Sequence, residues 1–131
     1  PTGVRPACPP ARFAQNLAQL VDRSLELGAH PILATPPPRL DFPADGTGGI
    51  MGPYADCVRQ VAESYHLSLI DVYAALIGHS DLPSLIPDRL HPGPDGHRIM
   101  ARQFASTLIP ICKPQASVVP EPSTIMAGVL A

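Results

Sequence analysis

Two short apolar segments, each following a helical repeat, constrain the fold of this chain most strongly. They are PILAT at residues 31–35 and SLIDV at residues 68–72. PILAT is too short for a helix and is bounded by proline, which predicts a buried strand, and SLIDV predicts a second short strand. Strands that alternate with helices pair in parallel, because the helix carries the chain back across the sheet. The sequence therefore predicts an α/β domain with parallel strands.

Three segments carry the apolar spacing of amphipathic helices. The first begins at Ala11 and ends before Gly28, a residue type common just after a helix. The second covers residues 54–65, and the third runs from Ile99 to Ile109, with Asp95 and Gly96 near its start. Since only two strands accompany these helices, we expect the chain to form part of a larger sheet.

The remaining segments predict connections. Residues 36–52 are rich in proline, aspartate and glycine, which predicts a long loop of the kind that often carries function. Residues 73–77 predict one or two helical turns, and residues 78–87 predict a second loop.

Charge and hydropathy exclude two classes of partner. The net charge of the 131 residues is -2 and only 15% of them are charged, below the roughly 25% that is typical. Without a basic surface a nucleic acid is not an expected partner. No run of about 20 apolar residues is present, so the sequence predicts no complete membrane helix.

The cysteines are Cys8, Cys57 and Cys112, which are far apart and form no CxxC pair. Because an odd number cannot all pair within one chain, we interpret them as buried or free thiols. One disulfide in an exported protein stays open as the alternative.

The densest cluster of reactive side chains is DRLHPGPDGH at residues 88–97. In a tight turn, the spacing of Asp88 and His91 lets the carboxylate reach the imidazole Nδ1. The carboxylate would then hold the tautomer whose Nε2 takes a proton from a nucleophile. Two other interpretations remain open. Asp88 could be a turn or cap residue beside a polar His91, or Asp88, His91 and His97 could bind a metal with a further ligand.

Residues 88–101, DRLHPGPDGHRIMA, resemble the last conserved block of the SGNH (GDSL) hydrolases. FAQNLAQLVDRSLELGAHPILATPPP and YADCVRQVAESYHLSLIDVYAAL are similar to the elements that precede this block, so the resemblance covers roughly residues 11–110. It implies a three-layer α/β/α flavodoxin-like fold and a serine ester hydrolase without a cofactor. Asp88 would be the triad acid and His91 the general base. The implied substrates are small esters or acylated carbohydrates and lipids.

Other parts of the family pattern have no counterpart in this chain. The nucleophilic serine of that family lies in a G-D-S block, and an oxyanion glycine and the asparagine of a G-x-N-D block follow it. Asn16, the only asparagine, lies within a helical pattern instead. We therefore expect residues 11–112 to be the C-terminal part of the hydrolase domain, incomplete at its N-terminal side and inactive alone. The alternative is a non-catalytic exported surface or matrix domain that retains the hydrolase scaffold.

The tail has a second resemblance. VPEPST at residues 119–124, followed by apolar residues, resembles the start of a PEP-CTERM sorting signal of bacteria, here cut short. This implies an exported protein of the cell envelope or exterior whose signal peptide lies outside this chain. The complete signal would anchor it transiently in the membrane and be processed by an exosortase-type enzyme. The expected organisation is a Pro-rich connector at 1–10, the hydrolase-like part at 11–112, and linker and tail at 113–131.

Overall fold

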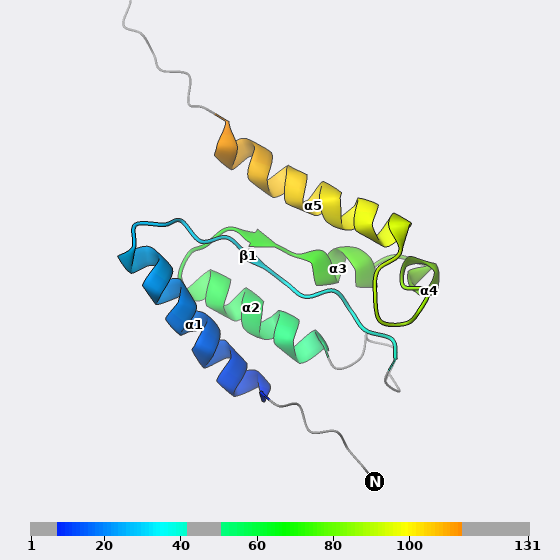
Figure 1. The fold of residues 1–131 in the computed structure, drawn as a ribbon, viewed down its shortest axis with the longest axis horizontal. Coiled ribbons are helices and arrows are strands. Elements are labelled where there is room, and N and C mark those ends of the chain that lie inside the picture. The colour runs from blue at the N-terminus through cyan, green and yellow to red at the C-terminus, as the bar shows by residue number, and fades with distance from the viewer. Residues whose placement is uncertain (1–7, 42–50, 114–131) are drawn as a thin grey trace, which may run out of the picture.

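The computed structural model describes residues 8–41 and 51–113. In chain order its elements are α1 (Pro10–Glu26), β1 (Leu33–Ala34), α2 (Gly52–Ser64), β2 (Leu69–Ile70), α3 (Val72–Ile77), α4 (Leu82–Leu85) and α5 (Pro94–Cys112). β1 and β2 pair in parallel. Helices α1 and α2 lie side by side on one side of the strands and α5 lies on the other, so three layers result (Figure 1). The predicted α/β fold with parallel strands is confirmed.

The helices match the predicted segments, with differences at their ends. α5 begins at Pro94 rather than at Ile99, because proline suits the first helical turn, where its missing N–H costs nothing. The predicted strand at 68–72 stops at Ile70, since the Asp71 carboxylate accepts a hydrogen bond from the Ala74 amide (3.0 Å) and caps α3. The loop predicted at 78–87 is wrong for residues 82–85, which form the single turn α4.

The prediction that residues 31–35 form a buried strand is wrong in length and in burial. β1 contains only Leu33 and Ala34, and of these five residues only Thr35 is buried, while Ala34 is exposed. The amides of Leu33 and Thr35 donate to the carbonyls of Ser68 and Ile70, both at 3.0 Å. The backbone groups of Ala34 therefore face away from β2. In the described ranges β1 pairs with β2 alone, and a parallel strand is buried only when it has neighbours on all sides.

The core lies between β2 and the last three helices. Its fully or almost fully buried members are Ile70, Val72, Leu76, Leu85 and Ile86. α1 contributes less than its apolar spacing predicts, because Val21 is buried while Leu20 and Leu25 are exposed. Leu85 and Ile86 of this cluster lie directly before residues 88–91 in the chain.

The cysteines are free, with Cys57 buried and Cys112 exposed, which confirms the interpretation as thiols. Across residues 8–41 and 51–113, none of the helices combines the length and the apolarity that crossing a bilayer requires. The VPEPST segment and most of the 36–52 loop lie outside the described residues.

Candidate active site

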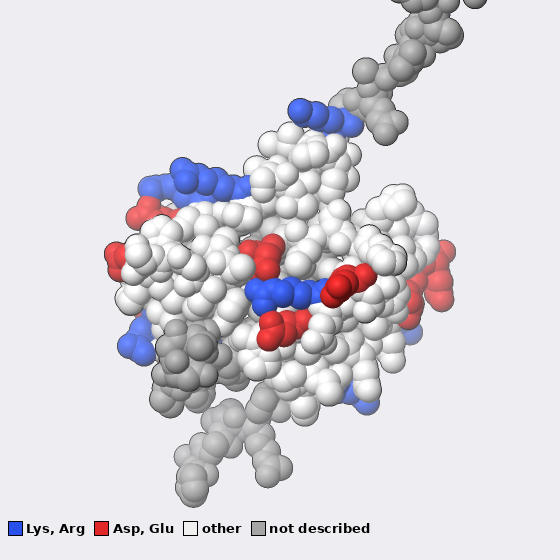
Figure 2. Space-filling model, turned by 180° about the vertical axis from the view of Figure 1, so that it is seen from behind, with Lys and Arg blue, Asp and Glu red and all other residues white. Residues whose placement is uncertain are grey.

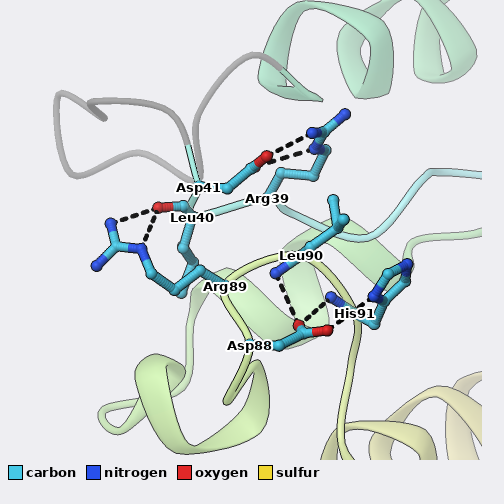
Figure 3. Close-up of polar contacts among 7 residues, drawn as sticks. All are labelled: Arg39, Leu40, Asp41, Asp88, Arg89, Leu90 and His91. Carbon is cyan, nitrogen blue, oxygen red and sulfur yellow. Dashed lines mark hydrogen bonds and ion pairs between the residues drawn. The ribbon is translucent and has the colours of Figure 1, made fainter.

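The Asp88 carboxylate organises a tight turn. Its Oδ1 accepts hydrogen bonds from the amides of Leu90 (2.9 Å) and His91 (2.6 Å), and its Oδ2 lies 2.8 Å from Nδ1 of His91 (Figure 3). Aspartate side chains commonly close turns in this way. One carboxylate thus holds both the backbone and the ring of His91, so the structure brings together the two residues that the sequence singled out.

This geometry decides the ionisation of Asp88. The backbone amide of His91, the His91 ring and the amide of Leu90 lower the pKa of the Asp88 carboxyl to about 2. An ionised carboxylate beside Nδ1 favours the tautomer with its proton on Nδ1 and leaves Nε2 as a proton acceptor. The His91 side chain is 73% exposed, so a group outside these residues can reach it.

Buried residues and close backbone contacts hold the turn in place. The Arg89 amide donates to the Ile86 carbonyl (2.9 Å), and the Gly93 amide donates to the Leu85 carbonyl (2.8 Å). A Cβ on Gly96 would lie 2.7 Å from the Leu85 carbonyl oxygen, so only glycine lets α5 approach this closely. The turn therefore rests on the core through Leu85 and Ile86.

The structure does not gather Asp88, His91 and His97, the three residues of the metal alternative, into one cluster. His97 lies exposed in the first turn of α5. Among the residues that the structure describes, no three histidines, cysteines or acidic residues gather closely enough to hold a metal ion. The structure therefore joins Asp88 to His91 and leaves His97 outside the pair.

A second polar network joins the carboxyl ends of the two strands. Thr35 follows β1, and its hydroxyl donates to Asp71 (3.0 Å), which follows β2, and accepts from the Tyr73 amide (2.8 Å). Arg59 of α2 donates to both oxygens of Asp71 at 2.8 and 3.0 Å. The sequence analysis missed this network, whose members lie as much as 38 positions apart.

The hydrogen bonds of this network give Asp71 a structural role. Burial raises the pKa of Asp71, but bonds from Arg59, the Ala74 amide and the Thr35 hydroxyl outweigh it, so that the pKa is lowered overall. An ionised carboxylate with four donors has little capacity left for a substrate. Asp71 therefore ties α2, β1 and α3 together at the edge of the sheet where open α/β folds bind ligands.

The pH dependence of the turn follows from Asp88. Because its pKa falls from 3.8 to about 2 in the folded state, its stabilising contribution is present above pH 3.8 and is lost as the pH falls through about 2. We expect the difference in unfolding free energy between wild type and Asp88→Asn to shrink over this interval, as urea titrations followed by circular dichroism would measure. Asp81→Asn is the control, since that side chain makes no cap hydrogen bond at α4. A difference between wild type and Asp88→Asn that stays constant with pH would contradict the prediction.

Charged side chains are few on the face of the molecule that Figure 2 shows. The face in Figure 2 is mostly uncharged, and the basic side chain at its centre is flanked by acidic ones. No continuous basic surface is seen on this face, in keeping with the net charge of -2.

The sequence matches the model of the GDSL-like lipase/acylhydrolase family over residues 4–99. Among solved structures it is similar to Axe2, an acetylxylan esterase from Geobacillus stearothermophilus, with a TM-score of 0.64 and 28% identity over 76% of this chain and 47% of that chain. It is also similar to LAE5, an alpha/beta hydrolase enzyme from the metagenome of Lake Arreo in Spain, with a TM-score of 0.63 and 30% identity over 81% of this chain and 50% of that one. No curated protein matches the chain.

The chain spans about half the length of these solved enzymes. Three of the solved forms of Axe2 are described as catalytic mutants, in which a serine, an aspartate and a histidine are each replaced by alanine. In that esterase the aspartate and the histidine lie three positions apart. Asp88 and His91 have the same spacing in this chain.

Proposed function

Because the chain belongs to the GDSL-like lipase/acylhydrolase family, we propose that it supplies the acid and the base of a serine ester hydrolase. The observation that carries the proposal is the 2.8 Å contact between Asp88 Oδ2 and His91 Nδ1, on a turn that leaves the imidazole exposed. The aspartate and histidine of the catalytic variants of Axe2, with the same spacing, support it.

In the proposed mechanism, Nε2 of His91 removes the proton of a serine hydroxyl as the serine oxygen attacks the ester carbonyl. The imidazolium then protonates the departing alcohol and leaves an acyl-serine. In the second half, His91 activates a water molecule that releases the acid and restores the serine. Asp88 holds the ring and stabilises the imidazolium. The serine and the oxyanion donors come from outside this chain.

We propose O-acyl esters as the substrate class, and acetyl groups on xylose-based oligosaccharides as the first candidates. The support is the description of Axe2 as an acetylxylan and acetyl-xylooligosaccharide esterase. Since the chain spans about half of that enzyme, the acyl-binding walls are expected to come partly from residues outside this chain.

The test is ester hydrolysis by the complete gene product that contains these residues, with 4-nitrophenyl acetate and with acetylated xylo-oligosaccharides. We expect acetate release from both by the complete product and none by the 131-residue chain alone, which lacks the nucleophile block. A folded complete product that hydrolyses neither substrate would contradict the proposal and favour a non-catalytic domain on the same scaffold.

We propose that the protein is exported, on the basis of its C-terminal tail. VPEPST at residues 119–124 supports export to the cell envelope or exterior, transient anchoring by a complete sorting signal, and recognition by an exosortase-type enzyme.

A further inference from the structure

Arg89 lies between the two residues of the proposed acid–base pair in an unusual backbone conformation. Its φ is +65°, in the left-handed region that favours glycine. The left-handed conformation of Arg89 reverses the chain direction, so that the amides of Leu90 and His91 both donate to the Asp88 carboxylate. An arginine in this conformation calls for a compensating interaction of its side chain.

That interaction is a two-way contact with Leu40, 49 positions earlier. Nε of Arg89 donates to the Leu40 carbonyl at 2.8 Å, and Nη2 donates to the same oxygen. In return, the Leu40 amide donates to the Arg89 carbonyl at 2.7 Å. Figure 3 shows the guanidinium lying against Leu40 on one side of the turn, while Asp88 and His91 lie on the other.

Leu40 is itself held relative to the sheet. Thr35, at the carboxyl end of β1, is buried and bonded to Asp71. Three prolines, residues 36–38, lead from Thr35 to Leu40, and Pro38 is fully buried. Because proline fixes φ, this segment has few conformations available and places Leu40 at a defined distance from the strand end. The neighbouring Arg39 and Asp41 form an ion pair with a 3.0 Å contact between Nε and Oδ1.

We propose that Arg89 is a positioning residue, which fixes the Asp88–His91 turn relative to the carboxyl edge of the sheet through its contact with Leu40. This inference rests on the proposed function, since a turn that did no chemistry would need no fixed place. Ligands of open α/β sheets bind at the carboxyl ends of the strands. A small displacement of the base from the reacting ester is enough to reduce the rate of a proton transfer greatly.

Two substitutions separate positioning from simple stabilisation. Arg89→Gly removes the guanidinium but adopts the left-handed conformation without strain. Arg89→Lys keeps a positive charge but replaces the two-nitrogen contact with a single ammonium. Arg98→Ala is the control, because Arg98 pairs with Asp95 on the exposed side of α5.

The experiment is an NMR titration of the aspartate carboxyl carbons in the 131-residue chain, with amide hydrogen exchange at Leu90 and His91. For Arg89→Gly we expect the pKa of Asp88 to rise from about 2 toward 3.8, amide exchange at least about tenfold faster, and an unchanged or higher midpoint of thermal unfolding. We expect Arg89→Lys to lie between wild type and Arg89→Gly, and Arg98→Ala to match wild type.

Wild-type titration and exchange in Arg89→Gly would overturn the proposal, and so would a loss confined to the unfolding midpoint. If Arg89→Gly does not fold, the test uses Arg89→Lys instead. A pKa of the Asp88 carboxyl in Arg89→Lys equal to that of wild type would also overturn the proposal. These readouts report the geometry of the turn and need no substrate. A failure of the proposed ester hydrolysis would therefore be seen in the activity assay and not here.

Discussion

Replacing His91 with alanine in the complete gene product is expected to lower kcat for 4-nitrophenyl acetate by at least about 10³-fold, because the change removes the proposed base of the attacking serine. Asp88→Asn is expected to lower kcat by about 10³- to 10⁴-fold, since an amide no longer favours the tautomer with its proton on Nδ1. KM should change little in either variant, because these residues act in the transition state rather than in binding. Initial rates over a range of ester concentrations measure both constants.

His97→Ala is the matched control for this experiment. His97 belongs to the same block of sequence and is exposed, but it lies in the first turn of α5, outside the Asp88–His91 pair. We expect the His97 variant to retain wild-type kcat and KM. Equal losses in His91→Ala and His97→Ala would mean that the block matters for folding and would contradict the assignment of the base.

Leu76→Ala is expected to destabilise the chain by about 2–5 kcal/mol, the usual cost of removing a buried leucine side chain. Leu76 is 0% exposed and packs in the cluster with Val72, Leu85 and Ile86. Domains of this size are stable by about 5–15 kcal/mol in total, so this loss is a large part of the margin. Urea denaturation followed by circular dichroism measures the free energy of unfolding.

Leu27→Ala is the same chemical change at an exposed position, where 87% of the residue's surface is accessible. We expect its free energy of unfolding to stay within about 0.5 kcal/mol of wild type, because no packed contact is removed. A Leu76→Ala variant as stable as Leu27→Ala would show that the cluster before residue 88 is not the core of the chain.

The elements that the sequence predicted well are those stabilised by neighbours in the chain. The spacing of Phe13, Leu17 and Val21 predicted α1, and the three-residue separation of Asp88 and His91 predicted that a turn could join carboxylate and imidazole. The hydrogen bonds of a helix and of such a turn connect residues at most four positions apart. A short window of sequence therefore contains the information needed.

The exposure of Ala34 could not be predicted in this way. PILAT is apolar enough for a buried strand, but burial depends on which strands lie beside it, and in the described ranges β1 has β2 alone. The same holds for Leu20 and Leu25 of α1, which have the apolar spacing of a helix although both are exposed. Hydropathy reports what a residue favours, whereas burial depends on the elements packed against it.

The sequence by itself determined the α/β class and the order of the main helices and strands, and it gave the pairing of Asp88 with His91 as one of three interpretations. Only the tertiary structure decided how that pair is held. The Arg89–Leu40 contact spans 49 positions and the Thr35–Asp71 contact spans 36. Such partners are chosen by where the chain folds back on itself, and no local pattern of residues encodes that distance. The contacts within the Asp88–His91 turn join residues close in sequence. Its position relative to the carboxyl edge of the sheet depends on long-range contacts that only the folded chain forms.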